Sequence, residues 1–352
     1  MARDEADLHP VLEVLRDRVA AGSKPGQRTD KFKVRTQAKR AYTGSVSVAC
    51  ARIACSLGMH STVEVGGTDD AVLCVPMKHA SRSEFNQHID GCMAGLTCHA
   101  CSVQVGLAIE GGGMRGCVSA GMVASIMSVG AMDCVDAVYG SSAGSLVGAY
   151  AIAAQPGMPR LGCSVYYDAL TNAGRSFIDT RFLGRAMGVG ALAVPFTRRA
   201  GLRDLARDRI GAPVIKLDYL LGDVVERLRP LDWERFWERQ RDQPMNIVAS
   251  GMHSHSSVVL NSAGGHFKTL RELTACMRAS MLLPGIAGPM VTLPGVDEPL
   301  VDSQLYEPIP YRAALNDGCT HVVVMRSRPD GCSLIGKPKL PERMIAKRYF
   351  TK

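Results

Sequence analysis

Residues 103–149 read VQVGLAIEGGGMRGCVSAGMVASIMSVGAMDCVDAVYGSSAGSLVGA. Two glycine-rich turns stand in this stretch, at 111–116 and 140–144, and each follows a short apolar run and precedes a helix-like run of small residues. This order is typical of a strand–helix–strand–helix unit, in which both helix N-termini lie at the same edge of a parallel sheet. The stretch therefore predicts an α/β fold with a mostly parallel central sheet flanked by helices.

The alternation of strand-like and helix-like runs continues after the two turns. In the helix expected at 117–129, Val118, Met122, Ile126 and Met127 share one side. Residues 160–215 are arginine-rich and less regular, around an apolar, glycine-containing centre that suits either a lid or a surface excursion. The remaining expected strands are 104–109, 135–139, 245–250, 257–261, 300–302 and 321–326, and the remaining helices are 142–154, 217–228, 231–240, 270–280 and 308–315.

The patterning divides the chain into three segments. Residues 1–102 comprise an amphipathic helix over 1–23, a basic linker over 24–45 and a cysteine-rich region without clear period. Residues 103–330 hold the alternating strands and helices. Residues 331–352 form a basic tail with a helical pattern that stops without a capping residue, as expected of a truncated chain.

The composition is that of a globular protein. Of the 352 residues, 46% are hydrophobic and 21% are charged, which allows a substantial core. The chain has no apolar run of about 18 residues, the length that spans a bilayer. The acidic N-terminus also lacks the apolar centre of a secretory signal. We therefore expect an intracellular protein, cytoplasmic or peripherally bound to membranes, with organelle targeting left open.

The charge balance indicates the kind of surface that the chain approaches. The net charge of +8 favours anionic surfaces, so we expect transient contact with acidic membrane lipids. Aromatic residues make up only 5% of the chain and do not alternate with basic ones. This argues against a nucleic-acid partner, because single strands bind by stacking on aromatic side chains.

The twelve cysteines show no repeated spacing, which indicates reduced thiols. One group has the residue types of a metal site, but it holds a single Cys-x-x-Cys. A cysteine-rich approach to a buried strand explains the group better than zinc does. We therefore expect no metal. The group comprises His88, Cys92, Cys98, His99 and Cys101.

Residues 140–144, Gly-Ser-Ser-Ala-Gly, have the form of a nucleophile elbow. Such a turn between strand and helix is so tight that Gly140 and Gly144, two residues before and after the nucleophile, must be nearly free of side chains. Ser142 is then presented at a helix N-terminus, whose dipole favours an alkoxide. The sequence predicts Ser142 as a catalytic nucleophile.

The first turn, residues 111–116, allows two interpretations. Its glycines fit the Gly-x-Gly-x-x-Gly pattern of a dinucleotide site. That site needs an acidic residue at the end of the next strand, whereas Asp133 and Asp136 precede this strand and the serine turn ends it. The alternative is an oxyanion hole, in which the N–H groups of Gly112 and Gly113 face a developing negative charge, each donor contributing about 10²–10³ in rate. We favour the oxyanion hole because it explains both turns together.

A serine nucleophile needs a base, and two candidates follow it. Ser142, Asp302 and His321 would give the triad order of α/β-hydrolases, although His321 opens an apolar strand and suits a structural edge position. Asp302 ends a strand, where its carboxylate could either contact Ser142 or cap the next turn. In an apolar site its pKa would rise enough for general-base catalysis, a gain of roughly 10²–10⁴ in rate.

These motifs resemble those of the patatin-like phospholipase family, over about residues 103–330. The family's oxyanion motif, Gly-Gly-Gly-x-(Arg/Lys)-Gly, matches residues 111–116 with Arg115 in the basic position, and its elbow matches residues 140–144. Its third motif, Asp-Gly-(Gly/Ala), reads Asp302-Ser303-Gln304 here, so the carboxylate is kept and both small residues are replaced. If the family glycine needs a positive φ, serine in its place is strained by roughly 1 kcal/mol or more.

The resemblance implies a three-layer sandwich whose active site is a serine–aspartate dyad without histidine, on a catalytic domain spanning residues 103–330. It also implies that Arg115 positions the oxyanion loop. The predicted site comprises Ser142 and Asp302 as catalytic residues, Gly111, Gly112, Gly113, Arg115 and Gly116 at the oxyanion hole, and Gly140 and Gly144 at the elbow.

By resemblance the chain is a serine hydrolase of carboxylic esters. We expect a lipid acyl hydrolase of phospholipase A or esterase type, acting on glycerolipids in lipid catabolism without cofactor or metal. Three alternatives stay open. The departure at Ser303 and Gln304 fits a weakened member that binds lipid or a membrane without turnover. A triad with His321 fits an esterase, and a dinucleotide site fits an oxidoreductase.

Overall fold

The computed structural model describes residues 10–24, 62–64, 72–74, 104–154, 160–182 and 213–328. The expected tail helix and the cysteine–histidine group lie outside these residues, as do residues 25–45 of the linker and the apolar centre at 186–196. Within residues 62–74, the strands β1 (Thr62–Glu64) and β2 (Val72–Cys74) form an antiparallel pair.

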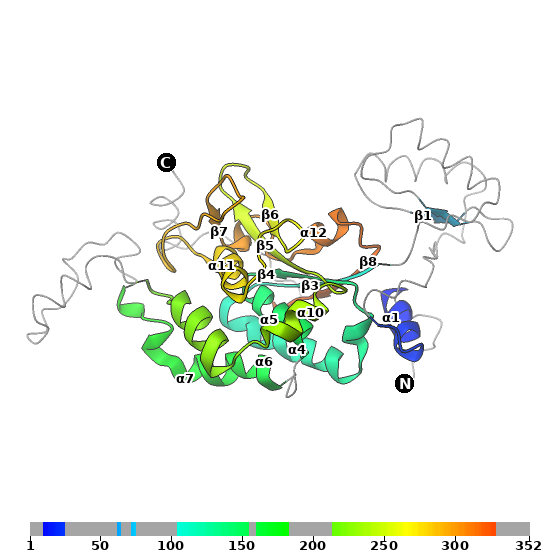
Figure 1. Ribbon diagram of the computed structural model, residues 1–352, viewed down its shortest axis with the longest axis horizontal. Helices are drawn as coiled ribbons and strands as arrows, with labels where there is room; N and C mark the ends of the chain where they lie inside the picture. Colours follow the sequence, from blue (N-terminus) through cyan, green and yellow to red (C-terminus); the bar gives the residue numbers. More distant parts are fainter. Residues whose placement is uncertain are drawn as a thin grey trace, which may run out of the picture.

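A six-stranded, mostly parallel sheet organises the fold, as the sequence predicts (Figure 1). Its order is β6-β5-β4-β3-β8, with β7 pairing with β5 off this path. β3 is parallel to β4 and to β8, and β4 is parallel to β5, whereas β6 and β7 run antiparallel to β5. The strands are β3 (Val105–Ile109), β4 (Ala137–Ser141), β5 (Met245–Gly251), β6 (Ser257–Leu260), β7 (Leu300–Val301) and β8 (His321–Met325).

Helices cover both faces of the sheet and make three layers, with α4, α5, α6 and α10 on one face and α12 on the other (Figure 1). Alternate residues of β4 point to these two layers: Val138 belongs to the main core, and Tyr139 packs with Ala314 of α12. The helical segments are α1 (Pro10–Ala20), η2 (Gly113–Arg115), α4 (Gly116–Ser128), η3 (Ala131–Cys134), α5 (Ala143–Ala153), α6 (Arg160–Ser164), η4 (Val165–Leu170), α7 (Thr171–Ala173), η5 (Gly174–Ser176), η6 (Thr180–Phe182), η8 (Tyr219–Leu228), α10 (Trp233–Arg239), α11 (Leu270–Met281), η9 (Ser303–Leu305) and α12 (Tyr311–Asn316).

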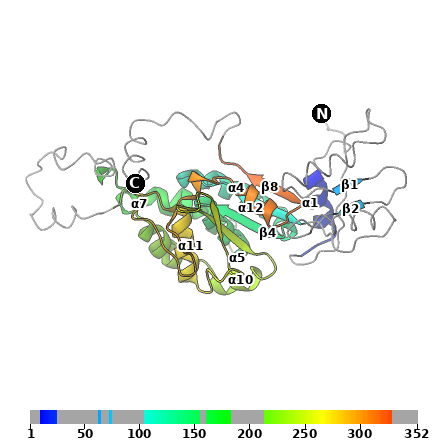
Figure 2. The same ribbon diagram turned by 90° about the horizontal axis from the view of Figure 1, so that it is seen from above.

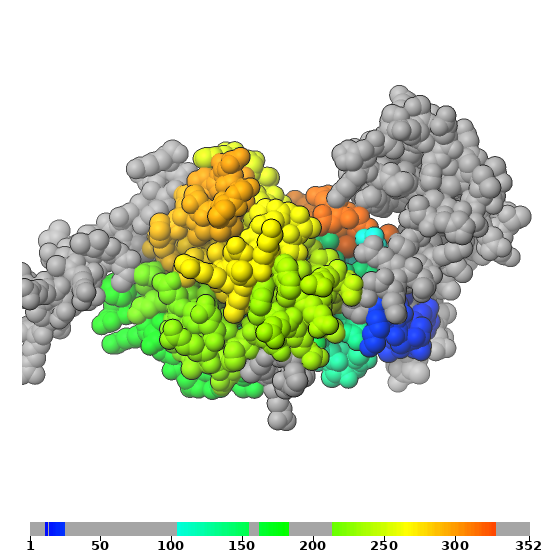
Figure 3. Space-filling model, viewed as in Figure 1, coloured from blue at the N-terminus to red at the C-terminus, as the bar shows by residue number. Residues whose placement is uncertain are grey.

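Helix α11 is partly exposed at the surface of the protein. On the face shown in Figure 3, α11 in yellow and the loop that follows it in orange lie side by side, above the green residues of η8 and α10. The N-terminus of α11 has a capping box, in which Thr269 accepts from the Glu272 N–H and Glu272 accepts from the Thr269 N–H. This fixed start orients the helix whose C-terminal half packs behind the serine turn.

The central helix α5 is buried along its whole length, because it lies between the sheet and its neighbours α4 and α10. Its small side chains let α4 approach closely, and α4 therefore turns Ser119, Ala120 and Val123 inward. Val118 and Met122 are 42% and 37% exposed. Of the four larger side chains that the spacing places together, Ile126 and Met127 pack against the core, and Val118 and Met122 do not.

Two helical segments differ from what the sequence predicts. Residues 160–173 form one continuous helical run, α6, η4 and α7, with a π-helical centre. The segment η8, expected as an ordinary helix over 217–228, is also π-helical. Apolar spacing alone does not distinguish the i→i+5 hydrogen bonds of these turns from the usual i→i+4 pattern.

None of the helices described is long and apolar enough to cross a bilayer.

The N-terminal helix α1 packs against the start of the sheet, beside β8 (Figure 2). Its Arg18 is 4% exposed, and Nη1 donates to Asp136 Oδ2 at 2.7 Å and to the Cys134 carbonyl at 2.6 Å. Asp136 Oδ2 also accepts from the Val105 N–H at 2.7 Å. One buried ion pair therefore joins α1 to the N-terminal ends of β3 and β4.

Candidate active site

The serine turn between β4 and α5 combines a strained backbone with close packing. Ser142 has φ 50° and ψ −121°, a backbone conformation that residues other than glycine rarely adopt. A Cβ on Gly140 would lie 2.5 Å from the Ser145 Cα, and a Cβ on Gly144 would overlap the Ile109 carbonyl. Both glycines are therefore required by close approach of the backbone.

The N–H, the carbonyl and the hydroxyl of Ser142 all form hydrogen bonds. Its N–H donates to Ser280 Oγ at 2.8 Å, and its carbonyl accepts from the Ser145 hydroxyl at 2.6 Å and the Ser145 N–H at 2.9 Å. Its own Oγ donates to Asp302 Oδ2 at 2.9 Å. Such bonds can sustain a strained φ, which costs of order 1–3 kcal/mol.

Asp302 follows β7 and uses its two carboxylate oxygens differently. Oδ1 accepts from the Gln304 N–H at 2.8 Å and caps η9, while Oδ2 faces Ser142. Burial raises the pKa of Asp302 to about 6, although the Gln304 N–H and the nearby hydroxyls of Ser142 and Ser303 act in the opposite direction. The capping role and the contact with serine, which the sequence leaves as alternatives, occur together.

Ser303 occupies its position without the strain expected from the family motif. Among the described non-glycine residues, positive φ occurs at Ser142, Ala154 and His255, and Ser303 is not one of them. Its side chain is fully buried, and its hydroxyl forms no hydrogen bond of ordinary geometry with the described atoms. Gln304 is exposed and contacts Asp302 through its backbone. Neither replacement displaces the carboxylate.

The glycine loop after β3 lies directly against the serine turn. A Cβ on Gly111 would be 2.9 Å from the Ser142 Cβ, and the Gly111 N–H already donates to the Pro308 carbonyl at 3.1 Å. The N–H groups of Gly112 and Gly113 have no acceptor among the residues described. Gly113 has φ 56°, which turns the chain into η2. Two backbone donors without a described acceptor thus follow Gly111, the residue that lies against the serine turn.

The two remaining residues of the loop motif secure its far end. The Arg115 N–H donates to the Gly112 carbonyl at 3.1 Å, and the exposed Arg115 side chain folds back over Gly112, where a Cβ would be 3.0 Å from Nη2. Gly116 packs flat on the Tyr166 ring, which leaves no room for a Cβ. Tyr166 in turn donates to the Ala143 carbonyl at 3.0 Å, next to Ser142.

His321 is far from the serine, so the triad with His321 is wrong. It opens β8 opposite Val105, at the N-terminal end of the parallel strands, whereas Ser142 follows the C-terminal end of β4. The four steps from His321 to Met325, the last of the five residues of β8, cover roughly 13 Å at the usual rise of a strand. Its Nδ1 lies 3.1 Å from Thr320 Oγ1, beside its own strand.

The dinucleotide interpretation also fails at the second strand. Asp136 pairs with Arg18, and Asp133 pairs with Lys24 and Arg239, so both carboxylates are held at the N-terminal end of β4. The C-terminal end of that strand carries Ser142 and no acidic residue, which leaves a ribose without its usual ligand. In the described part of the chain, no three His, Cys, Asp or Glu side chains cluster as a metal site.

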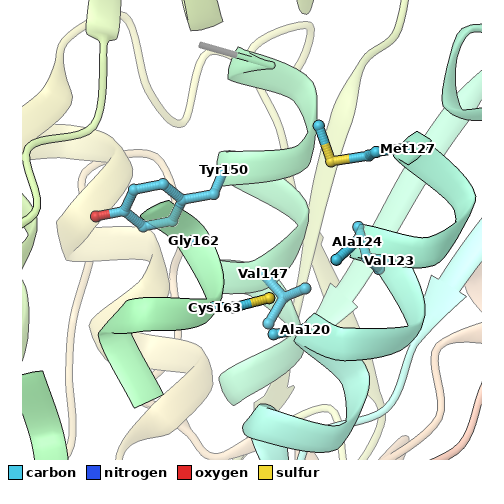
Figure 4. Close-up of a pocket in the computed structure, with 8 residues that line it drawn as sticks. All are labelled: Ala120, Val123, Ala124, Met127, Val147, Tyr150, Gly162 and Cys163. Carbon is cyan, nitrogen blue, oxygen red and sulfur yellow. The ribbon is translucent and has the colours of Figure 1, made fainter. Parts of the chain in front are cut away.

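A hollow between α4, α5 and α6 is too small for an acyl chain. Figure 4 shows Val147 and Cys163 close to Ala120, with the Tyr150 hydroxyl turned away from them. The hollow has a volume of about 10 Å³, which is roughly the space of one water molecule. It is a packing gap in the layer beneath the site.

Sequence reasoning missed Ser280 and Tyr166, both of which contact the serine turn. Ser280 lies 138 residues from Ser142 in the sequence, and its hydroxyl also donates to the Val248 carbonyl at 2.5 Å. Nothing in the local pattern of α11 distinguishes this serine from a small core residue. Tyr166 lies in the arginine-rich region that carried no strand or helix prediction.

Comparison with known proteins identifies the family of the chain. No curated protein matches the chain. Among solved structures, VipD from Legionella pneumophila matches with 13% identity and a TM-score of 0.34, over 57% of this chain and 46% of that one, so the chain spans less than half the length of VipD. The model of the family described as patatin-like phospholipase matches residues 107–315, more than half of the chain. The chain belongs to the patatin-like phospholipase family.

Proposed function

We propose that the protein is a lipid acyl hydrolase that cleaves glycerolipid ester bonds through a Ser142–Asp302 dyad. The observation that carries this proposal is the 2.9 Å contact between Ser142 Oγ and Asp302 Oδ2 in a site where both side chains are more than nine-tenths buried. Membership of the family supports ester chemistry on lipids. The net charge of +8 supports transient contact with anionic membranes, where such substrates occur.

In the first half of the reaction, Asp302 takes the proton from Ser142 Oγ as that oxygen attacks the ester carbonyl carbon. The carbonyl oxygen becomes an oxyanion, which the N–H groups of Gly112 and Gly113 stabilise because they have no other acceptor in the described structure. The intermediate collapses to an acyl-serine, and the leaving alcohol takes the proton back from Asp302. The raised pKa of Asp302, about 6, suits both transfers near neutral pH.

In the second half, Asp302 takes a proton from water, which attacks the acyl-serine carbonyl. A second oxyanion forms at the same N–H groups and collapses to release the fatty acid, while the proton returns to Ser142 Oγ. The exposed guanidinium of Arg115 keeps the loop folded over Gly112 during both steps. No cofactor or metal takes part in this scheme.

Three variants test the dyad on a short-chain ester. Ser142→Ala and Asp302→Asn are expected to lower kcat by at least about 10⁴-fold and 10²-fold respectively, because the first removes the nucleophile and the second the base. His321→Ala serves as the matched control and should change kcat by less than about threefold. A His321 variant as impaired as the Asp302 variant would contradict the dyad.

A catalytically weakened lipid-binding member is the second candidate, favoured by the replacements at Ser303 and Gln304. A fluorophosphonate ester distinguishes the two, since it labels a serine only when the nucleophile is activated. We expect labelling of the full chain at Ser142 and none in Ser142→Ala. Binding of vesicles without any labelling of the wild-type chain would favour the second candidate.

A further inference from the structure

A buried carboxylate stands immediately before the oxyanion loop and has no part in the dyad. Glu110 is fully buried between the end of β3 and Gly111, and its N–H donates to the Met325 carbonyl at 3.0 Å. Its Oε2 accepts from the Ser327 N–H at 2.5 Å and from the Ser327 hydroxyl at 2.9 Å. The segment that follows β8 is therefore anchored directly at the start of the loop.

The other carboxylate oxygen of Glu110 forms an ion pair with an arginine. Arg328 Nε lies 3.6 Å from Oε1, and the Arg328 side chain is 16% exposed. Oε1 has no hydrogen bond to any described atom. In the ranges that the structure describes, Arg328 is the one cation within ion-pair distance of Glu110. It lies outside the residues that match the family model, which end at 315.

A negative charge in this position would oppose the proposed chemistry. Gly112 and Gly113, whose N–H groups would receive the oxyanion, are only two and three residues from Glu110 in the chain. Charges interact strongly in a buried site, because little solvent screens them. An ionised Glu110 without a partner would raise the energy of the oxyanion more than that of the neutral ester.

We propose that Arg328 is a positioning residue that neutralises Glu110 and so preserves the oxyanion hole formed by Gly112 and Gly113. The inference rests on the proposed hydrolase function and assigns a role in it to the segment after β8. Arg328 touches no reacting atom in this scheme. It acts on the transition state through the charge of Glu110.

The test uses the full chain and compares three variants: Arg328→Gln, Glu110→Gln and the double variant. The rate of fluorophosphonate labelling and the kcat and KM for a short-chain ester are measured at about pH 9. Arg328→Gln should label at least about tenfold more slowly and lose kcat by a similar factor, with KM within about twofold of wild type. Glu110→Gln and the double variant should stay within about threefold of wild type.

Rescue by the double variant separates charge from fold. A purely structural ion pair would make all three variants similarly slow, and that result would overturn the inference while the proposed function stood. A wild-type chain that is neither labelled nor active would overturn both.

The matched control is Arg18→Gln, which breaks a buried ion pair with Asp136 at the opposite end of the sheet. It should lower the melting temperature and leave the labelling rate per folded molecule unchanged. An equal loss of labelling in Arg18→Gln and Arg328→Gln, at matched stability, would also overturn the inference.

Discussion

At the scale of single residues, the Ser280 hydroxyl stabilises the backbone conformation of Ser142, the proposed nucleophile. Ser142 has a positive φ that its own side chain disfavours, and its N–H points to the Ser280 hydroxyl at 2.8 Å. Without that hydroxyl, the Ser142 N–H would be buried and unsatisfied, a state that costs about 1–3 kcal/mol. The turn around Ser142 would have to shift for this N–H to find another acceptor, and the shift would separate Ser142 from Asp302.

We therefore expect Ser280→Ala to reduce kcat on a short-chain ester by about tenfold or more with little change in KM, because a small displacement at a reacting atom acts on the transition state. Thr274→Ala is the control. It removes a buried hydroxyl from the same helix, one that donates to the Arg271 carbonyl and does not contact Ser142. Equal losses of kcat in the two variants, at equal melting temperature, would contradict this role for Ser280.

At the scale of elements, the contact between α4 and η4 fixes where the glycine loop after β3 ends. Gly116 begins α4 flat against the Tyr166 ring, and Tyr166 bonds the first turn of α5. Gly116→Ala should destabilise the fold by about 1–3 kcal/mol, since an added methyl group has no space there. It should also lower esterase activity, because α4 and the loop would move together.

Gly121 offers a matched control for this prediction on the same helix. It is exposed, and a Cβ there would meet nothing within 4 Å. Gly121→Ala should therefore raise stability by up to about 1 kcal/mol through helix propensity, with activity unchanged. Urea denaturation of both variants measures the two opposite shifts, and shifts of the same sign would refute the packing argument.

The sequence predicts elements well where pattern and chemistry agree. The strands at 104–109 and 321–326 and the helix at 142–154 correspond to β3, β8 and α5 within two residues. It fails for the orientation of α4, because close helix packing favours Ser119 and Ala120 over the larger Val118 and Met122, which hydrophobicity alone would bury. The π-helical turns escape prediction since their spacing resembles that of an ordinary helix.

At the scale of the whole molecule, the candidate site gathers distant segments at the C-terminal edge of one sheet. The serine turn could be predicted from the sequence. The backbone passes so close to Gly140 and Gly144 that both must be glycine, and this leaves a local pattern around Ser142. Ser280, Glu110 and Arg328 could not, because each acts through a partner that only the fold brings near. Topology separates His321 from Ser142, since parallel strands place their starts and ends at opposite edges of the sheet.

The buried Asp302 links the site to the pH dependence of folding. Its pKa is raised to about 6 in the fold, against about 3.9 in an unfolded chain. The folded state therefore holds the extra proton between these values, and stability falls as pH rises from about 4 to about 6. Above about pH 6, the ionised Asp302 lowers the free energy of unfolding by about 2–3 kcal/mol, the amount that corresponds to a pKa shift of this size.

Asp302→Asn removes that ionisation while keeping an acceptor for the Gln304 N–H. This variant should thus be more stable than the wild type at pH 8, by up to about 3 kcal/mol, and the difference should vanish near pH 4. Asp179→Asn should behave oppositely at pH 8, because hydrogen bonds from Arg181 lower the pKa of Asp179 to about 2 and its ionised form stabilises the fold. Urea denaturation of both variants at the two pH values measures this contrast. An Asp302→Asn protein less stable than wild type at pH 8 would mean that the carboxylate is held there by favourable contacts that outweigh its burial.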